Sequence, residues 1–371
     1  MRAATYRHLH LGAGPLGLGL VAFATSRAGF DVVLASRRGD PDSAGRAATL
    51  RQNNSYLVSS ITRENPSLTA NAELVDVERY LFTGPAEDWN EILEEVRRPE
   101  TILVTTALTT KGLEDCVPML SQLLQARVQA TDSPLFIIPC ENQTGERYAE
   151  LTREVLPTNI VFLAAVVDRV CMRLAHDSLD GRLHVVVPVE PFADWIIERK
   201  TGFTEPLEQI LAPLVPGLVR FSPDIQQEHV RKLWFVNGVH TLVAIFAKLE
   251  RHVFLDDFLA TPGGETLLRG VQEELLDATQ TRLGAESIFA EEDLRLFGDR
   301  IAERFRAFPD LVDRIIKRFT PEELPEFVKR DLHAKVVSAA ELLFRHGMFP
   351  FGLTNGLFGA ARLIAQEHFA R

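Results

Sequence analysis

A glycine-rich turn close to the N-terminus restricts the fold of this chain more than any other feature. Residues 6–11 read as a short β-strand, Gly12-Ala-Gly-Pro-Leu-Gly17 follows, and an apolar helical stretch continues to Ala28. Residues 31–36, DVVLAS, read as a second strand. The order of strand, glycine turn, helix and strand predicts the first unit of a doubly wound α/β domain.

Alternating strands and helices continue through the first half of the chain. Over residues 56–82, side chains alternate in character as in a small antiparallel insertion, which we call the antiparallel excursion. The parallel pattern returns at residue 101. The further elements expected are the strand TILVTTA, a helix over residues 112–127, and the strands PLFIIPCEN, NIVFLAAVVDR and RLHVVVPVEP. The α/β region therefore extends to about Pro191.

The second half has a different character, because long amphipathic helical runs replace the strands after Pro223. These runs cover residues 225–252, 265–282, 291–307, 311–319 and 324–345. Pro213 and Pro216 mark the boundary, since proline interrupts regular elements. We expect a Rossmann-type dinucleotide-binding domain over residues 1–217 and an all-α substrate and catalytic domain over residues 218–371.

The composition argues against several partners and locations. The formal net charge of -11 and the pI of about 5.5 disfavour binding to nucleic acid or to anionic lipid. The chain has no apolar run of about 18 residues and no signal-peptide pattern, so neither a membrane span nor export is expected. Three widely spaced cysteines favour a reducing compartment. We expect a cytoplasmic protein.

The glycine turn has the spacing of a dinucleotide fingerprint. Glycines at these positions permit a tight turn and let the backbone approach a pyrophosphate at a helix N-terminus. Without a nucleotide, the same turn would be only a structural connection. The residues expected to bind the cofactor here are Gly12, Gly14, Pro15, Leu16 and Gly17, with Thr105, Thr106 and Asn142 from later strands.

The end of the second strand indicates which dinucleotide binds. Where the fingerprint usually has Asp or Glu, the chain reads Ala35-Ser36-Arg37-Arg38. A carboxylate would repel a ribose 2′-phosphate, whereas a hydroxyl and two guanidinium groups would bind it. We therefore expect NADP(H) to be preferred and NAD(H) to be usable. The alternative is that both arginines are solvated and that Asp40 or Asp42 binds the ribose.

A second polar group lies within an apolar segment, RKLWFVNGVH, at the start of the helical half. At about 100 degrees per residue, an α-helix places His240 about 80 degrees from Lys232 and about 60 degrees from Asn237. The three side chains could therefore converge on one pocket. Taken singly, each has an ordinary structural explanation: a surface lysine, an asparagine bonded to backbone, and a core histidine.

Five separated motifs then resemble one family, the polyol-specific long-chain dehydrogenases and reductases, or mannitol dehydrogenase family. They are GAGPLGLG, PCENQTGE at 139–146, VVDRV at 166–170, VEPFADWIIE at 189–198, and Lys232-x4-Asn237-x2-His240. They keep the family's order and cover most of residues 6–250. The helical last third is similar only in character, with an arginine at Arg314.

The resemblance implies hydride transfer between a nicotinamide cofactor and a secondary alcohol of an acyclic sugar alcohol. It implies that Lys232 is the general acid/base, that Asn237 and Asn142 stabilise the reacting oxygen, and that His240 orients the substrate. Asp168 and Arg314 match further substrate-binding positions. The resemblance also implies a monomer or a weak dimer. An amine can take the alcohol proton near neutral pH if its surroundings lower its pKa, and amide donors stabilise a developing oxyanion.

The substrate stays open at this stage. The compact length and the CEN motif look most like the branch that acts on mannitol 1-phosphate and fructose 6-phosphate. A basic residue of that branch is replaced by Glu322 here, and Lys317 or Arg318 could compensate. Mannitol or arabinitol 2-dehydrogenation, and reduction of fructuronate or tagaturonate, are the alternatives. A module that senses NADP(H) without turnover is the non-enzymatic one.

Other reactive residues have ordinary explanations. Cys140 has no visible base partner and reads as a small buried residue. His8 and His10 could form a metal pair, but solvated or capped histidines are commoner in strands. We expect no metal site.

Overall fold

The computed structural model describes residues 6–37, 41–83, 88–141, 146–153, 157–316 and 327–369. The chain divides into two compact units, residues 1–225 and 226–371. The first unit extends beyond the expected boundary at residue 217 because β13 (Val219–Ser222) pairs in parallel with β12 (Asp194–Glu198). The proline-rich segment is therefore a connection inside the first unit.

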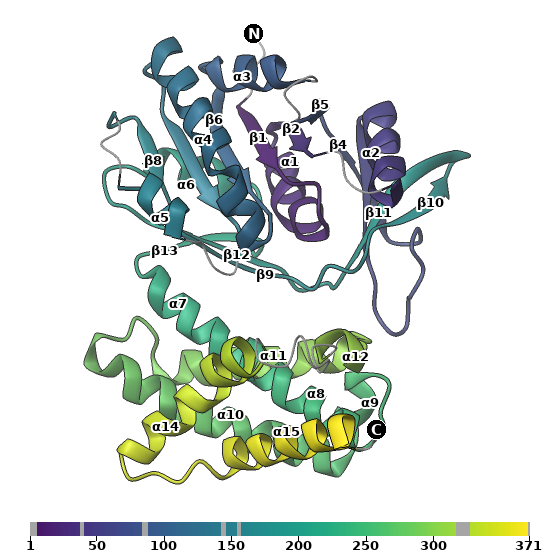
Figure 1. Ribbon diagram of the computed structural model, residues 1–371, viewed down its shortest axis with the longest axis vertical. Helices are drawn as coiled ribbons and strands as arrows, with labels where there is room; N and C mark the ends of the chain where they lie inside the picture. Colours follow the sequence, from purple (N-terminus) through teal and green to yellow (C-terminus); the bar gives the residue numbers. More distant parts are fainter. Residues whose placement is uncertain are drawn as a thin grey trace. The chain divides into compact units, whose positions relative to one another are not determined.

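A six-stranded parallel sheet forms the centre of the first unit (Figure 1). Its strand order is β5 (Arg79–Phe82), β2 (Asp31–Ser36), β1 (Arg7–Leu11), β6 (Thr101–Thr106), β7 (Leu135–Pro139) and β8 (Ile160–Phe162). The order reverses between β1 and β6, and ligands of doubly wound sheets bind at such a point, outside the carboxyl ends of the strands. The Rossmann-type architecture is confirmed.

Side-chain alternation along β1 explains how this sheet is covered on both faces. Leu9 and Leu11 pack with α3 (Trp89–Arg97) and α4 (Thr110–Ala130), whereas His8 and His10 lie on the opposite face. That face is covered by η1 (Gly17–Ala22) and α1 (Phe23–Arg27). The other helices of the unit are α2 (Pro41–Asn53), α5 (Glu146–Leu151) and α6 (Glu205–Leu211).

Two smaller sheets complete the first unit. One has the order β10 (Ala175–Leu179), β11 (Arg182–Val189), β3 (Ser55–Ser60), β4 (Ala72–Asp76); the other has the order β13, β12, β9 (Ala165–Asp168). The antiparallel pairing of β3 with β4 confirms the expected excursion. The segment NIVFLAAVVDR, expected as one strand, forms β8 and β9 in different sheets, so that expectation was wrong.

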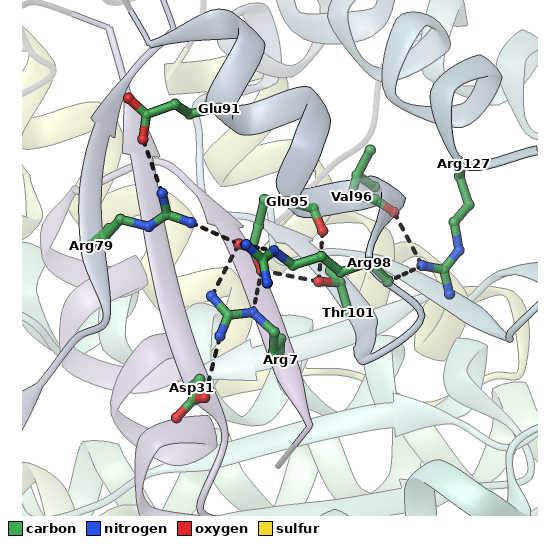
Figure 2. Close-up of polar contacts among 9 residues, drawn as sticks. All are labelled: Arg7, Asp31, Arg79, Glu91, Glu95, Val96, Arg98, Thr101 and Arg127. Atoms are coloured by element: carbon green, nitrogen blue, oxygen red, sulfur yellow. Dashed lines mark hydrogen bonds and ion pairs between the residues drawn. The ribbon is translucent and has the colours of Figure 1, made fainter. Parts of the chain in front are cut away.

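Buried charges fix the amino ends of the central strands (Figure 2). The carboxylate of Glu95, 0% exposed on α3, accepts from Arg7 Nε at 2.6 Å and Arg7 Nη2 at 3.0 Å. Thr101 Oγ1 donates to the same carboxylate at 3.0 Å, and Arg79 Nη2 at 3.2 Å. Burial raises the pKa of Glu95, but Arg7, Thr101 and Arg98 together outweigh burial and lower it overall. The ion pair ties β1, β5, β6 and α3 together.

The second unit is all-helical over the residues described. Its elements are α7 (Ile225–Arg231), η2 (Lys232–Gly238), α8 (Val239–Leu249), α9 (Leu255–Leu259), α10 (Pro262–Leu283), η3 (Gly284–Glu286), α11 (Glu291–Ala307), α12 (Val312–Ile315), η4 (Phe327–Val337), α14 (Ser338–Arg345) and α15 (Phe351–Phe369). One apolar core joins them, with Trp234, Phe235 and Val239 fully or almost fully buried. The all-α prediction for this half is confirmed.

Candidate active site

The glycine turn lies at the carboxyl end of β1, and its close contacts require glycine. Gly12 has a φ of +115°, and a Cβ there would lie 2.6 Å from the carbonyl oxygen of Ala107. A Cβ on Gly17 would lie 2.4 Å from His10 Nε2. The helix begins at Pro15, where a missing N–H costs nothing. The turn thus brings backbone and a helix N-terminus to the end of the strand, as a pyrophosphate requires.

A cavity of about 510 Å³ opens beside this turn. Its lining includes Gly12, Gly14, Pro15, Ser36, Arg37, Arg46, Tyr80 and Arg173. Among the lining residues that the structure describes, three are arginines and none is an aspartate or glutamate. The cavity therefore offers an anion both backbone amides and guanidinium groups, which fits the phosphates of a dinucleotide.

The remaining residues expected to contact the cofactor lie in different places. Leu16 packs partly buried against the core, and Gly17 is buried beneath the turn. Thr105 is fully buried and its hydroxyl contacts two histidine rings, while Thr106 Oγ1 donates to Glu141 Oε2 at 3.0 Å. These residues do not line the cavity. Arg38 and Asn142 lie outside the described residues.

Glu141 supports the loop that follows β6. Its carboxylate accepts from the backbone N–H of Leu108 at 2.8 Å as well as from Thr106. Burial raises the pKa of Glu141, although these bonds oppose the rise. Burial also raises the pKa of the neighbouring Cys140 thiol well above its usual value, which keeps it protonated and unreactive. Glu141 had no assigned role in the sequence, and its place directly after a buried strand was the available signal.

Lys232, Asn237 and His240 lie on one continuous helical segment of the second unit. Each is partly exposed, whereas the intervening Trp234 and Phe235 are 1% exposed. Residues 232–238 form a π-helical turn, η2, before α8 begins. The expected angles assumed an α-helix, so they do not apply here, because i→i+5 bonding widens the turn. Such turns occur frequently at functional sites.

His240 belongs to a charged cluster in which Arg314 also takes part. His240 Nε2 lies 3.0 Å from Asp310 Oδ2, and its ring stacks on Phe305 with centroids 4.8 Å apart. Arg314 Nε donates to Asp310 Oδ1 at 2.6 Å, and Arg314 Nη2 to Asp310 Oδ2. Although burial raises it, the bonds from His240 and Arg314 lower the pKa of Asp310 to about 2. The structure thus joins two predicted residues through a carboxylate that the sequence did not single out.

Two further polar residues are His229 of the second unit and Asp168 of the first unit. His229, on the turn before Lys232, has its pKa lowered by burial and then by the charges of Lys232 and Arg282. Asp168 is 8% exposed at the end of β9, where it pairs with Asp194 in the first unit. His229 was not predicted, but its spacing of three residues from Lys232 could have suggested it.

Two structural findings concern metals and membranes. Within the described ranges, no three His, Cys, Asp or Glu side chains are grouped so that they could hold a metal ion. In the same part of the chain, no helix is both long and apolar enough to span a bilayer.

Known proteins match this chain along most of its length. A mannitol-1-phosphate 5-dehydrogenase from Pseudarthrobacter chlorophenolicus is 28% identical over 377 residues, covering 95% of this chain and 84% of that protein. One from Lactococcus lactis is 24% identical over 328 residues, covering 83% and 75%.

Solved structures show the same fold at low sequence identity. The Pseudomonas fluorescens mannitol 2-dehydrogenase, in a ternary complex with NAD and D-mannitol, has a TM-score of 0.62 at 14% identity, covering 98% of this chain and 79% of that one. A substrate-free D-sorbitol dehydrogenase has a TM-score of 0.69 at 15% identity, covering 98% and 81%. The family model described as the mannitol dehydrogenase Rossmann domain matches residues 6–208. Since this match covers more than half of the 371 residues, the chain belongs to the mannitol dehydrogenase family of oxidoreductases.

Proposed function

We propose that this protein is a polyol dehydrogenase that interconverts mannitol 1-phosphate and fructose 6-phosphate with a nicotinamide cofactor. The observation that carries the proposal is Lys232, a partly exposed amine on a π-helical turn whose neighbours Trp234 and Phe235 are buried. Two relatives matched over three quarters or more of their length bear the name mannitol-1-phosphate 5-dehydrogenase. Family membership favours an enzyme over a module that only senses NADP(H).

The side chains divide the chemistry between them. When bound, the nicotinamide exchanges a hydride with the carbon that carries the reacting hydroxyl. In the oxidation direction, the neutral amine of Lys232 takes the hydroxyl proton, and in reduction the ammonium returns it. The amides of Asn237 and Asn142 donate to the reacting oxygen and stabilise its negative charge without changing protonation state. No step in this scheme needs a metal.

His240 acts as a substrate-orienting group in this scheme. Asp310 is ionised near neutral pH, because its pKa is lowered to about 2, and it accepts from the Nε2–H of His240. In a neutral ring, Nδ1 is then an acceptor for a substrate hydroxyl. Stacking on Phe305 limits rotation of the ring. The same carboxylate holds Arg314, so the orientations of the two substrate-binding residues are linked.

The phosphate group distinguishes this substrate pair from its alternatives. Arg314 is the described candidate to bind it, although its Nε and Nη2 already donate to Asp310. Lys317, Arg318 and Glu322 lie outside the described residues. If the phosphate is not bound here, mannitol, arabinitol, fructuronate and tagaturonate are the alternative substrates, and the same chemistry at Lys232 serves all of them.

NADP(H) is the cofactor that we propose is preferred. Ser36 and Arg37 line the cavity beside the glycine turn, and Arg46 and Arg173 line it as well. Ser36 Oγ lies 2.5 Å from the hydroxyl of Tyr80, which fixes the side chain at the end of β2. A 2′-phosphate carries negative charge that several guanidinium groups can bind. The absence of carboxylates among the described lining residues supports this choice.

The proposal also covers location and assembly. None of Cys116, Cys140 and Cys171 is in a disulfide, which suits a reducing cytoplasm. We propose a monomer or weak dimer, as the family resemblance implies.

An absorbance assay at 340 nm tests the function. Purified protein is mixed with NADPH or NADH and with fructose 6-phosphate, fructose, fructuronate or tagaturonate in turn. Oxidation of NADPH with fructose 6-phosphate is the expected result. Turnover with another keto sugar alone would keep the chemistry but reassign the substrate pocket. Tight cofactor binding with no turnover on the panel would contradict the proposed activity.

A further inference from the structure

A chain of buried polar side chains runs beneath the glycine turn, between the central sheet and α1. His8, His10, Thr25 and Thr105 are each 0% exposed. His8 Nδ1 lies 2.8 Å from Thr25 Oγ1, and His8 Nε2 lies 2.6 Å from Thr105 Oγ1. His10 Nδ1 contacts the same Thr105 oxygen at 2.6 Å. His8 and His10 were expected to be solvated or capped strand residues, and that expectation was wrong: both are buried, in a linked group of four polar side chains.

The linked polar side chains end at His10 Nε2, which lies beside the glycine turn. His10 Nε2 is buried, and no group of the described residues meets full hydrogen-bond geometry with it, although the Gly12 carbonyl is close enough to act on the pKa of the ring. A Cβ built on Gly17 would lie 2.4 Å from this nitrogen and 2.5 Å from the carbonyl oxygen of Gly12. The imidazole edge and the Gly12 carbonyl are therefore close neighbours. The third glycine of the fingerprint is required here because no side chain fits between them.

The hydroxyl protons determine whether His10 Nε2 is a donor. A threonine hydroxyl has one proton, so Thr105 must donate to one ring and accept from the other. If Thr25 donates to the Val21 or Ala22 carbonyl, both 3.2 Å away, the chain ends with a lone pair of His10 facing the Gly12 oxygen. The opposite direction, from Thr25 through His8 and Thr105, ends with Nε2–H facing that oxygen. In the second direction, Nε2–H attracts the Gly12 oxygen, whereas in the first direction the two lone pairs repel each other.

We propose that His10 is a positioning residue for the cofactor-binding turn, holding the Gly12 carbonyl towards the core through Nε2–H. In a trans peptide the N–H points opposite to the carbonyl, so this aims the Ala13 N–H away from the core. Ala13 lines the cavity of about 510 Å³. The Gly12 N–H donates to the Ala35 carbonyl at 2.8 Å, so both peptide groups at Gly12 are then fixed.

The protonation state of His10 is consistent with this role. Burial lowers the pKa of His10 to about 4, and the Gly12 carbonyl opposes that fall. Burial and the neighbouring His10 lower the pKa of His8 as well. Both rings are therefore neutral in the working range of pH, and each carries a single N–H.

The test measures cofactor binding without any sugar, so it does not depend on the substrate proposal. NADH and NADPH are titrated by their fluorescence against wild type and His10→Leu. The variant is expected to bind both cofactors about tenfold more weakly, because a misaligned amide weakens one hydrogen bond to a charged phosphate. His184 is 5% exposed on β11 and is not part of the linked group of His8, His10, Thr25 and Thr105. It supplies the control His184→Leu, which should bind both cofactors as wild type does.

Two amide variants separate positioning from packing. The glutamine amide nitrogen reaches the position of Nε2, whereas the asparagine amide nitrogen reaches only that of Nδ1. His10→Gln should therefore keep cofactor affinity within about twofold of wild type, and His10→Asn should lose it like His10→Leu. Equal losses in the two amide variants, or an equal loss in His184→Leu, would overturn the proposal. If His10→Leu does not fold, the comparison of the two amides still decides the outcome.

Discussion

Replacing Arg173 by alanine should make the affinities for NADPH and NADH nearly equal. Arg173 lines the cavity beside the glycine turn together with Arg37 and Arg46. A hydrogen bond to a charged group contributes about 1.5–3 kcal/mol, and each 1.4 kcal/mol corresponds to about a tenfold change in affinity. Loss of one guanidinium should therefore weaken NADPH binding by about 10- to 100-fold. NADH lacks the 2′-phosphate, so its binding should change by less than about threefold.

The assay is a titration of intrinsic or cofactor fluorescence with NADPH and NADH at two salt concentrations. Arg182, exposed on β11 and outside the cavity lining, gives the matched control Arg182→Ala, which removes the same charge. Arg37→Ala should behave like Arg173→Ala, since both line the same cavity. If NADPH and NADH lose affinity equally in the Arg37 and Arg173 variants, those arginines serve the shared pyrophosphate and the 2′-phosphate argument fails.

Three other substitutions test the second unit and the ion pair under the sheet. Lys232→Ala should lower kcat by about 100-fold or more while the Kd for NADPH stays unchanged; normal turnover would exclude Lys232 as the base. Asp310→Asn should raise KM for the sugar. It should also lower the free energy of unfolding by roughly 2 kcal/mol near pH 7, because the folded protein depresses the pKa of Asp310 from 3.8 to about 2. The extra stability of the wild type should therefore be lost as the pH falls from about 4 to about 2. Denaturant unfolding measures the stability of both proteins. If the wild type stayed equally more stable than Asp310→Asn at acid pH, ionisation of Asp310 would not be the cause. Glu95→Ala should lower the free energy of unfolding by about 3 kcal/mol, because Arg7 is left buried without its main partner, yet leave NADPH affinity unchanged.

The nucleotide-binding part of the fold could be predicted because local sequence determines it. Gly12 needs a positive φ and Gly17 needs space, so both are visible as glycines at fixed spacing. Strand β1 shows its two faces by alternation of leucine with histidine. The split of NIVFLAAVVDR into β8 and β9 was not predictable, because residues 160–167 are all apolar and only pairing with β7 or β12 separates the two strands.

Residues brought together from distant segments were the ones that the sequence did not reveal. Arg46 lies within α2 and Arg173 lies before β10, and neither belongs to a recognisable motif. They line one cavity with Arg37, and α2 packs near β11 in the same unit. The sequence around Ser36 therefore reveals Arg37, whereas Arg46 and Arg173 join it only through the tertiary fold.

The helical site shows a different limit of sequence reasoning. The amphipathic run over residues 225–252 predicted the helix, but the angles between Lys232, Asn237 and His240 assumed the rotation per residue of an α-helix, which η2 does not have. Asp310 is 70 residues from His240 and four from Arg314, so only the second relation is visible locally. A carboxylate four residues before an arginine is common on helices and usually means a surface ion pair of little consequence. Its meaning changes here because Asp310 is 4% exposed, and a buried carboxylate holding two cationic or donor groups fixes both of them.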